Sequence, residues 1–196
     1  MIDDITRFFV LTGGPGSGKS ALVEALARGR YAQMPEAGRA IIREQVAADG
    51  RALPWIDPAA FAELMLARDV RAHRNAQHQH GLVFFDRGIP DVAGYMRLSG
   101  LAVPPHMDLS AKTIRYNGRV FIMPPWRDIF TQDSERKQDF DEAVRTYETL
   151  ATTYADYGYE LMEVPRAPIA QRTPFILQNA GPPYSILITG AAMLSV

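Results

Sequence analysis

The sequence has no cysteine among its 196 residues. This absence excludes disulfide bonds, thiolate metal sites and a cysteine nucleophile, and it fits a reducing compartment. The sequence also lacks an excess of charge of either sign, because 21 lysines and arginines are matched by 22 aspartates and glutamates, for a formal net charge of -1. No overall basic field therefore argues for a nucleic acid or an anionic membrane as partner, and small molecules are the expected partners.

Long apolar runs are absent as well. No stretch reaches the roughly 18 apolar residues that a membrane-spanning helix needs. The first five residues carry two acids where a secretory signal would need basic residues and a longer apolar stretch. We therefore expect a cytoplasmic protein without a membrane span. The length suits one α/β domain, which we place at residues 1–178, and residues 179–196 form a C-terminal tail of unknown role.

The clearest feature that is present is a glycine-rich loop at residues 13–20, which fits the phosphate-binding pattern G-x-x-x-x-G-K-[S/T] at every fixed position. Glycines let successive backbone N–H groups turn inward around an anion. The lysine then supplies a positive charge toward the β- and γ-phosphates, and the final serine offers a hydroxyl to Mg²⁺. The expected nucleotide-binding residues are Gly13, Gly14, Pro15, Gly16, Ser17, Gly18, Lys19 and Ser20.

The residues on either side of this loop have the pattern that a phosphate loop requires. An apolar run at 8–11 predicts a buried strand before it, and the spacing of apolar residues predicts a helix at 20–28 after it. Strand, loop and helix are thus all present. We predict that the loop binds a nucleoside triphosphate.

A second apolar strand, at 82–85, ends in Asp86 and Arg87. A phosphate-loop enzyme keeps the acid that orients Mg²⁺ or its water shell at such a position, although Asp86 could instead cap the helix predicted at 89–98. Arg87 stands where hydrolytic motor ATPases place a glutamate that polarises water, so we expect it to bind a phosphate. The D-x-x-G match at 91–94 is set aside, because the sequence has no N-K-x-D to read guanine.

A short strand predicted at 31–34 leads into P-E-A-G-R at 35–39. If this strand is parallel to its neighbours, Glu36 and Arg39 project into the ligand crevice beside the phosphate loop. Alternatively, Glu36 only begins the helix predicted at 40–48, where an acid is favourable against the helix dipole. The sequence leaves both interpretations open.

Residues 131–138 follow a strand predicted at 119–123 and are polar and charged, without apolar periodicity. This composition suits a mobile cover over the active site. Arg127, Arg136 and Lys137 would then close on the phosphates and exclude water. The alternative is a solvated charged loop.

Histidines at positions 73, 78 and 80 lie near the end of a long helix predicted over about 58–79. Their spacings of five and two do not put all three on one helical face. We therefore expect a solvated helix end rather than a metal site.

The remaining segments continue an alternation of strands and helices. Helices are predicted at 107–115, 140–154 and 167–178, and a strand at 159–165. Arg172, on the last of these helices, is expected to be exposed or to face the crevice. The alternation predicts a parallel sheet with right-handed crossovers and helices on both faces.

These motifs together resemble the P-loop kinase group, which includes nucleoside and nucleotide kinases. The wider resemblance rests on the phosphate loop, on F-F-D-R-G at 84–88 and on the arginine-bearing segment 127–137. A narrower resemblance, over about residues 7–178, is to the small predicted ATPase/kinase family of AAA-type domains. This resemblance rests on P-E-A-G-R at 35–39, F-D-R-G-I-P-D at 85–91 and P-P-W-R-D-I-F at 124–130. It implies a three-layer α/β fold with a five-stranded parallel sheet of the 2-3-1-4-5 type and a small lid.

The resemblance also implies binding of Mg²⁺ with ATP or GTP, and in-line transfer of the ATP γ-phosphoryl group to a small acceptor related to nucleosides or nucleotides. By position, Lys19, Ser20 and Asp86 match the family's phosphate and magnesium residues, and Arg127 with Arg136 its lid arginines. The expected catalytic residues are Lys19, Glu36, Asp86, Arg87, Arg127 and Arg136, and the expected magnesium ligands are Ser20 and Asp86. The alternative function is a regulatory nucleotide switch with slow hydrolysis. The acceptor, the base preference and the oligomeric state stay open.

Overall fold

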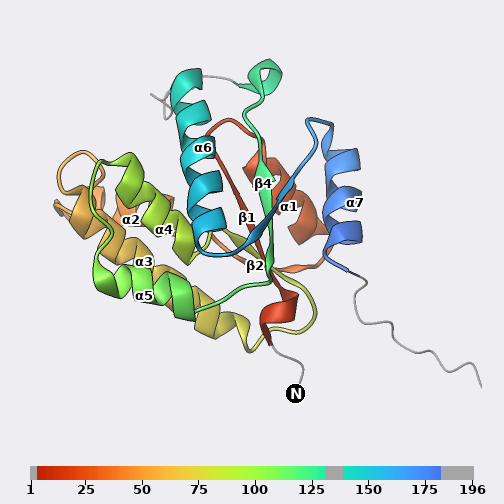
Figure 1. Cartoon of the computed structure of the whole chain (residues 1–196), viewed down its shortest axis with the longest axis horizontal. Coiled ribbons are helices and arrows are strands. Elements are labelled where there is room, and N and C mark those ends of the chain that lie inside the picture. The colour runs from red at the N-terminus through yellow and green to blue at the C-terminus, as the bar shows by residue number, and fades with distance from the viewer. Residues whose placement is uncertain (1–3, 131–138, 182–196) are drawn as a thin grey trace, which may run out of the picture.

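The computed structural model describes residues 4–130 and 139–181. A parallel sheet lies at its centre, with helices on both faces (Figure 1). The strand order is β2-β3-β1-β4-β5, and each neighbouring pair is parallel. The predicted fold class and sheet order are confirmed.

The strands are β1 (Phe8–Gly13), β2 (Ala32–Met34), β3 (Val83–Asp86), β4 (Arg119–Met123) and β5 (Glu160–Glu163). The helices are α1 (Lys19–Arg28), α2 (Ala37–Ala47), α3 (Pro58–Ala76), α4 (Ile89–Leu98), α5 (Pro105–Thr113), α6 (Phe140–Asp156) and α7 (Ile169–Asn179), with 3-10 turns η1 (Asp4–Arg7) and η2 (Arg127–Ile129). Each predicted helix and strand is present. The predicted and observed bounds differ by a few residues. Helix α2, for example, starts at Ala37 instead of residue 40, because Glu36 is its N-cap.

The central strands are buried on both faces, which is why they read as continuous apolar runs. In β1, Phe8 and Val10 pack into the core beneath α3, α4, α5 and α6, whereas Phe9 and Leu11 pack against α1 and α7. Figure 1 shows α1 and α7 together on one side of the sheet, and α4 and α6 on the other. The chain therefore forms three layers.

Helix α3 begins at a well-defined cap. Asp57 accepts a hydrogen bond from the backbone N–H of Ala60 (2.9 Å), and Pro58 occupies the first helical turn. Leu64 on this helix is an exposed apolar residue. In the part of the chain that the structure describes, no helix is both long and apolar enough to cross a membrane.

The prediction of a solvated helix end at His73 is wrong. The ring of His73 is buried edge-on against Phe8 and Tyr116, and its Nε2 lies 2.8 Å from the carbonyl oxygen of Arg115. Helix α3 ends at Ala76, so the two following histidines, at 78 and 80, lie beyond it and are exposed. The helix periodicity places His73 on the buried face, four residues after the partly buried Asp69.

The register of the sheet brings the predicted site segments to one edge. Leu11 in β1 lies opposite Asp86 in β3 and opposite Phe121 in β4. Because the strands are parallel, the loop after β1, Glu36 after β2 and Arg87 after β3 share the carboxyl edge of the sheet.

Candidate nucleotide-binding site

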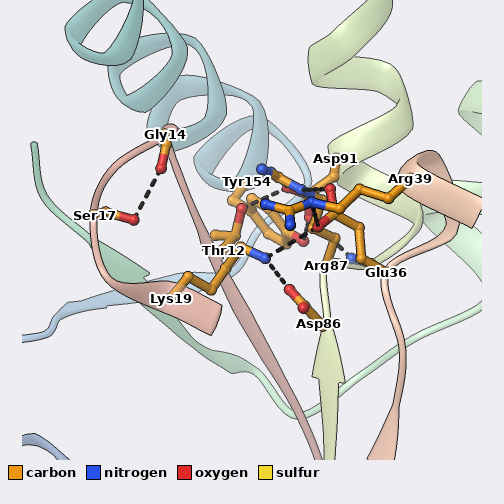
Figure 2. A network of polar contacts seen from close by, with 11 residues as sticks. Thr12, Gly14, Ser17, Lys19, Glu36, Arg39, Asp86, Arg87, Asp91 and Tyr154 are labelled. Carbon is orange, nitrogen blue, oxygen red and sulfur yellow. Dashed lines mark hydrogen bonds and ion pairs between the residues drawn. The ribbon is translucent and has the colours of Figure 1, made fainter. Parts of the chain in front are cut away.

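The loop between β1 and α1 has the backbone of an anion-binding turn. Gly16 and Gly18 have φ angles of 72° and 76°, in the left-handed region that favours glycine. Gly18 is the N-cap of α1, so the positive end of this helix faces the loop. The hydroxyl of Ser17 donates to the carbonyl oxygen of Gly14 (2.9 Å) and fixes the turn (Figure 2).

Lys19 points into the site rather than into solvent. Its side chain is 7% exposed, its Nζ donates to Asp86 Oδ1, and Glu36 Oε2 lies 3.7 Å from the same nitrogen (Figure 2). The N-cap of α4 is Gly88, so the alternative in which Asp86 caps that helix is wrong. The P-loop lysine thus lies between the ends of β2 and β3.

Three cations surround the carboxylate of Glu36. Its oxygens lie 3.2 Å from Arg87 Nε and 3.7 Å from both Lys19 Nζ and Arg39 Nε. Burial alone would raise the pKa of Glu36, but Arg87, Lys19 and Arg39 outweigh burial and lower it to about 2. Glu36 is also the N-cap of α2, but its side chain makes no capping hydrogen bond, so the interpretation in which Glu36 only begins that helix is wrong.

Arg87 is held between two carboxylates. Its Nη1 donates to Asp91 Oδ1 (3.0 Å), while its Nε faces Glu36. Burial lowers the pKa of Arg87, but Glu36 and Asp91 raise it by more. The backbone of Arg87 is left-handed, with φ of 77°, which costs about 1–2 kcal/mol for a residue with a Cβ. These two bonds, and the N–H bond to the carbonyl of Leu11 (3.0 Å), hold it there.

Sequence reasoning missed Asp91 as a residue of the site. Asp91 is 6% exposed and accepts hydrogen bonds from Thr12 Oγ1 (2.5 Å), Arg87, the N–H of Gly88 (2.9 Å) and the hydroxyl of Tyr154 (Figure 2). It therefore joins the end of β1, the start of α4 and α6. Two local signals were available: an acid three residues after a glycine N-cap, and an i,i+4 pair with an arginine.

Asp69 is a second carboxylate that sequence reasoning missed. It lies on α3, three residues after the buried Leu66 and four before His73, so it belongs to the inner face of the helix. Burial raises the pKa of Asp69 to about 8, and the charge of Asp91 adds to the shift. Among the described residues it has no hydrogen-bond or ion-pair partner. At neutral pH most of this carboxyl group carries its proton.

The opposite side of the P-loop is covered by η2 and α7. A Cβ at Gly16 would lie 2.3 Å from Phe130 Cδ2, and a Cβ at Gly18 would lie 2.7 Å from Arg172 Nη1. Arg172 is only 2% exposed. The alternative in which Arg172 is exposed is wrong, and its guanidinium lies against the loop.

The predicted lid arginines lie only partly within the described residues. Arg127 is exposed and its Cζ lies 4.1 Å from the ring centroid of Phe140, at the start of α6. Arg136 and Lys137 lie outside the described residues. Phosphate binding by Arg127 and Arg136 stays a prediction.

Ser20 and Asp86 are the residues suited to hold Mg²⁺. Ser20 lies in the first turn of α1 and Asp86 ends β3, and a magnesium site formed by these two residues stays a prediction. Hydroxyl and carboxylate oxygens are ligands that Mg²⁺ prefers, usually together with waters and nucleotide phosphates. Among residues 4–130 and 139–181 there is no group of three or more histidines and acids that could hold a metal alone.

Comparison with protein families gives one assignment. The model of a family described as an AAA domain matches residues 8–172. The matched range contains the P-loop, Glu36, Asp86, Arg87 and the whole sheet. No protein with a curated function matches the sequence.

Several solved structures, two of them of kinases, share the fold. Deoxyadenosine kinase from M. mycoides, with dCMP and a flexible dCDP bound, superposes with a TM-score of 0.62 at 12% identity, over 88% of this chain and 97% of that one. Thymidylate kinase from Ehrlichia chaffeensis gives 0.57 at 14% identity, over 89% and 97%. The NadR protein in complex with NR gives 0.58 at 17% identity, over 82% of this chain and 46% of that one. At these identities the likeness establishes the fold alone, that of the P-loop kinases.

Proposed function

The chain belongs to the AAA domain family, whose P-loop binds nucleotides, and from this premise we propose that it transfers the γ-phosphoryl group of Mg-ATP to a hydroxyl of a small, nucleoside-like acceptor. The observation that carries the proposal is Glu36. This residue places an ionised carboxylate 3.7 Å from the P-loop lysine, at the carboxyl edge of the sheet. A carboxylate there is well placed to accept a hydrogen bond from an attacking hydroxyl.

The role of Glu36 is to orient the acceptor. With a pKa of about 2 the carboxylate is ionised at neutral pH, but it is a weak base. Phosphoryl transfer passes through a loose transition state, in which positioning and charge stabilisation matter more than early removal of the proton. Arg87 supports this role, because its bonds to Glu36 and Asp91 fix the direction of the carboxylate.

The P-loop residues take the phosphates. Lys19 leaves Asp86 and Glu36 to contact the β- and γ-phosphates, and the N–H groups around Gly16 and Gly18 bind the phosphate oxygens. Ser20 and Asp86 would hold Mg²⁺, which would supply positive charge to neutralise the phosphates. Arg87 stands where a water-activating glutamate would be expected, which supports transfer to an acceptor over simple hydrolysis.

The test is ADP release from Mg-ATP in the presence of a panel of nucleosides, nucleotides and other small hydroxyl compounds. We expect one class of acceptor to raise the rate, and Lys19→Ala to reduce the stimulated rate about 10²–10³-fold through lost charge stabilisation. Glu36→Gln should lower the stimulated rate and leave the affinity for ATP unchanged. Glu24→Gln is the matched control, because Glu24 lies on the exposed face of α1 with 71% of its side chain accessible.

Two outcomes would contradict the proposal. If no acceptor raises ADP release although ATP binds tightly, the weight moves to the alternative function, a nucleotide switch with slow hydrolysis that depends on a protein partner. If Glu36→Gln leaves the acceptor-stimulated rate unchanged, Glu36 does not orient the acceptor.

A further inference from the structure

The carboxylate of Asp91 is bound by donors from three separate parts of the fold. Its Oδ1 accepts hydrogen bonds from Thr12 Oγ1 (2.5 Å) and from Arg87 Nη1 (3.0 Å). Its Oδ2 accepts from the N–H of Gly88 (2.9 Å) and from the hydroxyl of Tyr154. An ionised carboxylate has about four lone-pair sites, so these four donors fill the acceptor sites of Asp91 and fix its orientation.

The hydroxyl groups of Thr12 and Tyr154 are not used by the chemistry described above. Both side chains are fully buried. A buried hydroxyl is costly unless it is hydrogen-bonded, and each of these two donates to Asp91 (Figure 2). Burial, together with the charge of Asp91, raises the pKa of Tyr154 well above its ordinary value of 10, so its hydroxyl keeps the proton that it donates.

Thr12 and Tyr154 belong to the two elements that carry or border the P-loop. Thr12 directly precedes the loop, at the end of β1. Helix α6, which carries Tyr154, packs so closely against the loop that a Cβ at Gly14 would lie 2.5 Å from the carbonyl oxygen of Ala143. The two hydroxyls therefore tie Asp91 to the donor side of the site.

Arg87 connects Asp91 to the acceptor side of the site. Its guanidinium contacts Asp91 through Nη1 and donates through Nε to Glu36 Oε1 (3.2 Å). Because the guanidinium is planar, fixing one of its nitrogens on Asp91 limits the direction from which Nε meets Glu36. Small shifts are important here, since a misplacement of about 1 Å can cost about 10²-fold in rate.

We propose that Thr12 and Tyr154 are positioning residues for the transfer reaction. They act through Asp91 and Arg87, and they hold the carboxylate of Glu36 in place beside the P-loop. This inference rests on the proposed function, in which Glu36 orients the acceptor hydroxyl. It adds two buried side chains whose hydrogen bonds link the donor side of the site to the acceptor side.

The kinetic test removes one hydroxyl at a time and keeps the shape of each side chain. Tyr154→Phe and Thr12→Val should lower the acceptor-stimulated kcat about 10-fold to 10²-fold and leave the KM for ATP within twofold. Thr12→Ser keeps the hydroxyl and should keep most of the rate. Tyr147→Phe is the matched control and should change neither value, because Tyr147 lies on the same helix but donates to Glu163 (2.6 Å) at the end of the edge strand β5.

A second measurement needs no acceptor. The Nε–H of Arg87 donates to Glu36, so its NMR signal, assigned by its loss in Arg87→Met, should exchange slowly with water. Tyr154→Phe and Thr12→Val should each speed this exchange about tenfold, the size of one lost hydrogen bond. Exchange of a side-chain N–H follows local opening, so a general loss of stability does not produce the same change.

Three results would overturn the proposal. If exchange at Arg87 is as slow in Tyr154→Phe and Thr12→Val as in the unmodified protein, the two hydroxyls do not position the arginine. If the stimulated kcat is unchanged, their hydrogen bonds have no effect on the reaction. If the KM for ATP rises as much as kcat falls, the hydroxyls support the P-loop alone. A panel without a stimulating acceptor would contradict the kinase proposal, and exchange at Arg87 would still decide whether the hydroxyls position it.

Discussion

Arg87 and Arg172 lie on opposite sides of the P-loop, the first partly buried and the second buried, and their surroundings differ in kind. The guanidinium of Arg87 contacts Glu36 at 3.2 Å and Asp91 at 3.0 Å. Arg172 has no carboxylate partner among the described residues, and it lies beside Gly18 and Trp126. The pKa of Arg87 is raised by its two acids, whereas that of Arg172 is lowered by burial.

The difference separates a cation whose charge neighbouring acids compensate from one whose charge the described residues leave uncompensated. A buried charge with two good partners is strongly destabilising to disrupt, because the partners lose their compensation. A buried charge without a partner costs stability in the free protein, and a ligand that satisfies it gains affinity in return. Arg87 therefore belongs to the scaffold that orients Glu36, whereas Arg172 is a cation beside the P-loop without a carboxylate partner among the described residues.

The largest expected effect is therefore on stability. Arg87→Met leaves the buried Asp91 without its cation and the partly buried Glu36 without its nearest one, and it should lower the free energy of unfolding by about 3–5 kcal/mol. Arg172→Met should not lower it and should raise it by about 1 kcal/mol, since no ion pair is broken and an uncompensated buried charge is removed. Urea unfolding of both variants at pH 7 measures the two values.

The comparison would fail if the two substitutions destabilised the protein equally. Arg39→Met is a control for the loss of positive charge near Glu36, because Arg39 is 57% exposed and lies 3.7 Å from that carboxylate. A surface pair of this kind contributes about 0–1 kcal/mol.

The sequence predicted the parts of this site that depend on strand ends. A glycine-rich loop after one apolar strand and Asp86 at the end of another must meet if the two strands are adjacent and parallel, and the register puts Leu11 opposite Asp86. The same reasoning applies to Glu36 after β2. These residues follow their strands closely in sequence, so the order and direction of the strands are enough to predict where they lie.

The residues that the sequence did not predict depend on helix rotation and on distant contacts. Asp91 reaches Arg87 because α4 starts directly after Gly88, and Tyr154 reaches Asp91 from 63 residues further along the chain. Asp69 was hidden among the polar positions of α3, although its spacing from Leu66 places it on the inner face. Arg172 could have been exposed or buried until the packing of α7 against α1 was known.

The second prediction concerns the stability that the carboxylate of Glu36, with its neighbouring cations, contributes at low pH. The folded-state pKa of Glu36 is about 2, below its ordinary value of 4.5, so its ionisation stabilises the fold above about pH 4.5 and this contribution is lost as the pH falls toward 2. The lost contribution is about 3 kcal/mol at most. Glu36→Gln should show a weaker fall in the midpoint of thermal unfolding over this window. If the midpoint of thermal unfolding falls equally with pH in both proteins, the low pKa assigned to Glu36 is contradicted.

The smallest expected effect concerns the carboxyl group of Asp69, which has no ion-pair partner in the part of the chain that the structure describes. Asp69 has a folded-state pKa raised from 3.8 to about 8, so the folded protein holds a proton that the unfolded chain releases, and stability falls as the pH rises from about 4 through 8. Because the side chain is partly accessible to water, we expect Asp69→Asn to stabilise the protein by about 1–3 kcal/mol at pH 9 and to have little effect at pH 4. Asp49→Asn, at an exposed position after α2, should change stability at neither pH. If Asp69→Asn destabilises the protein at pH 9, Asp69 is paired when ionised, and the carboxylate network extends to α3.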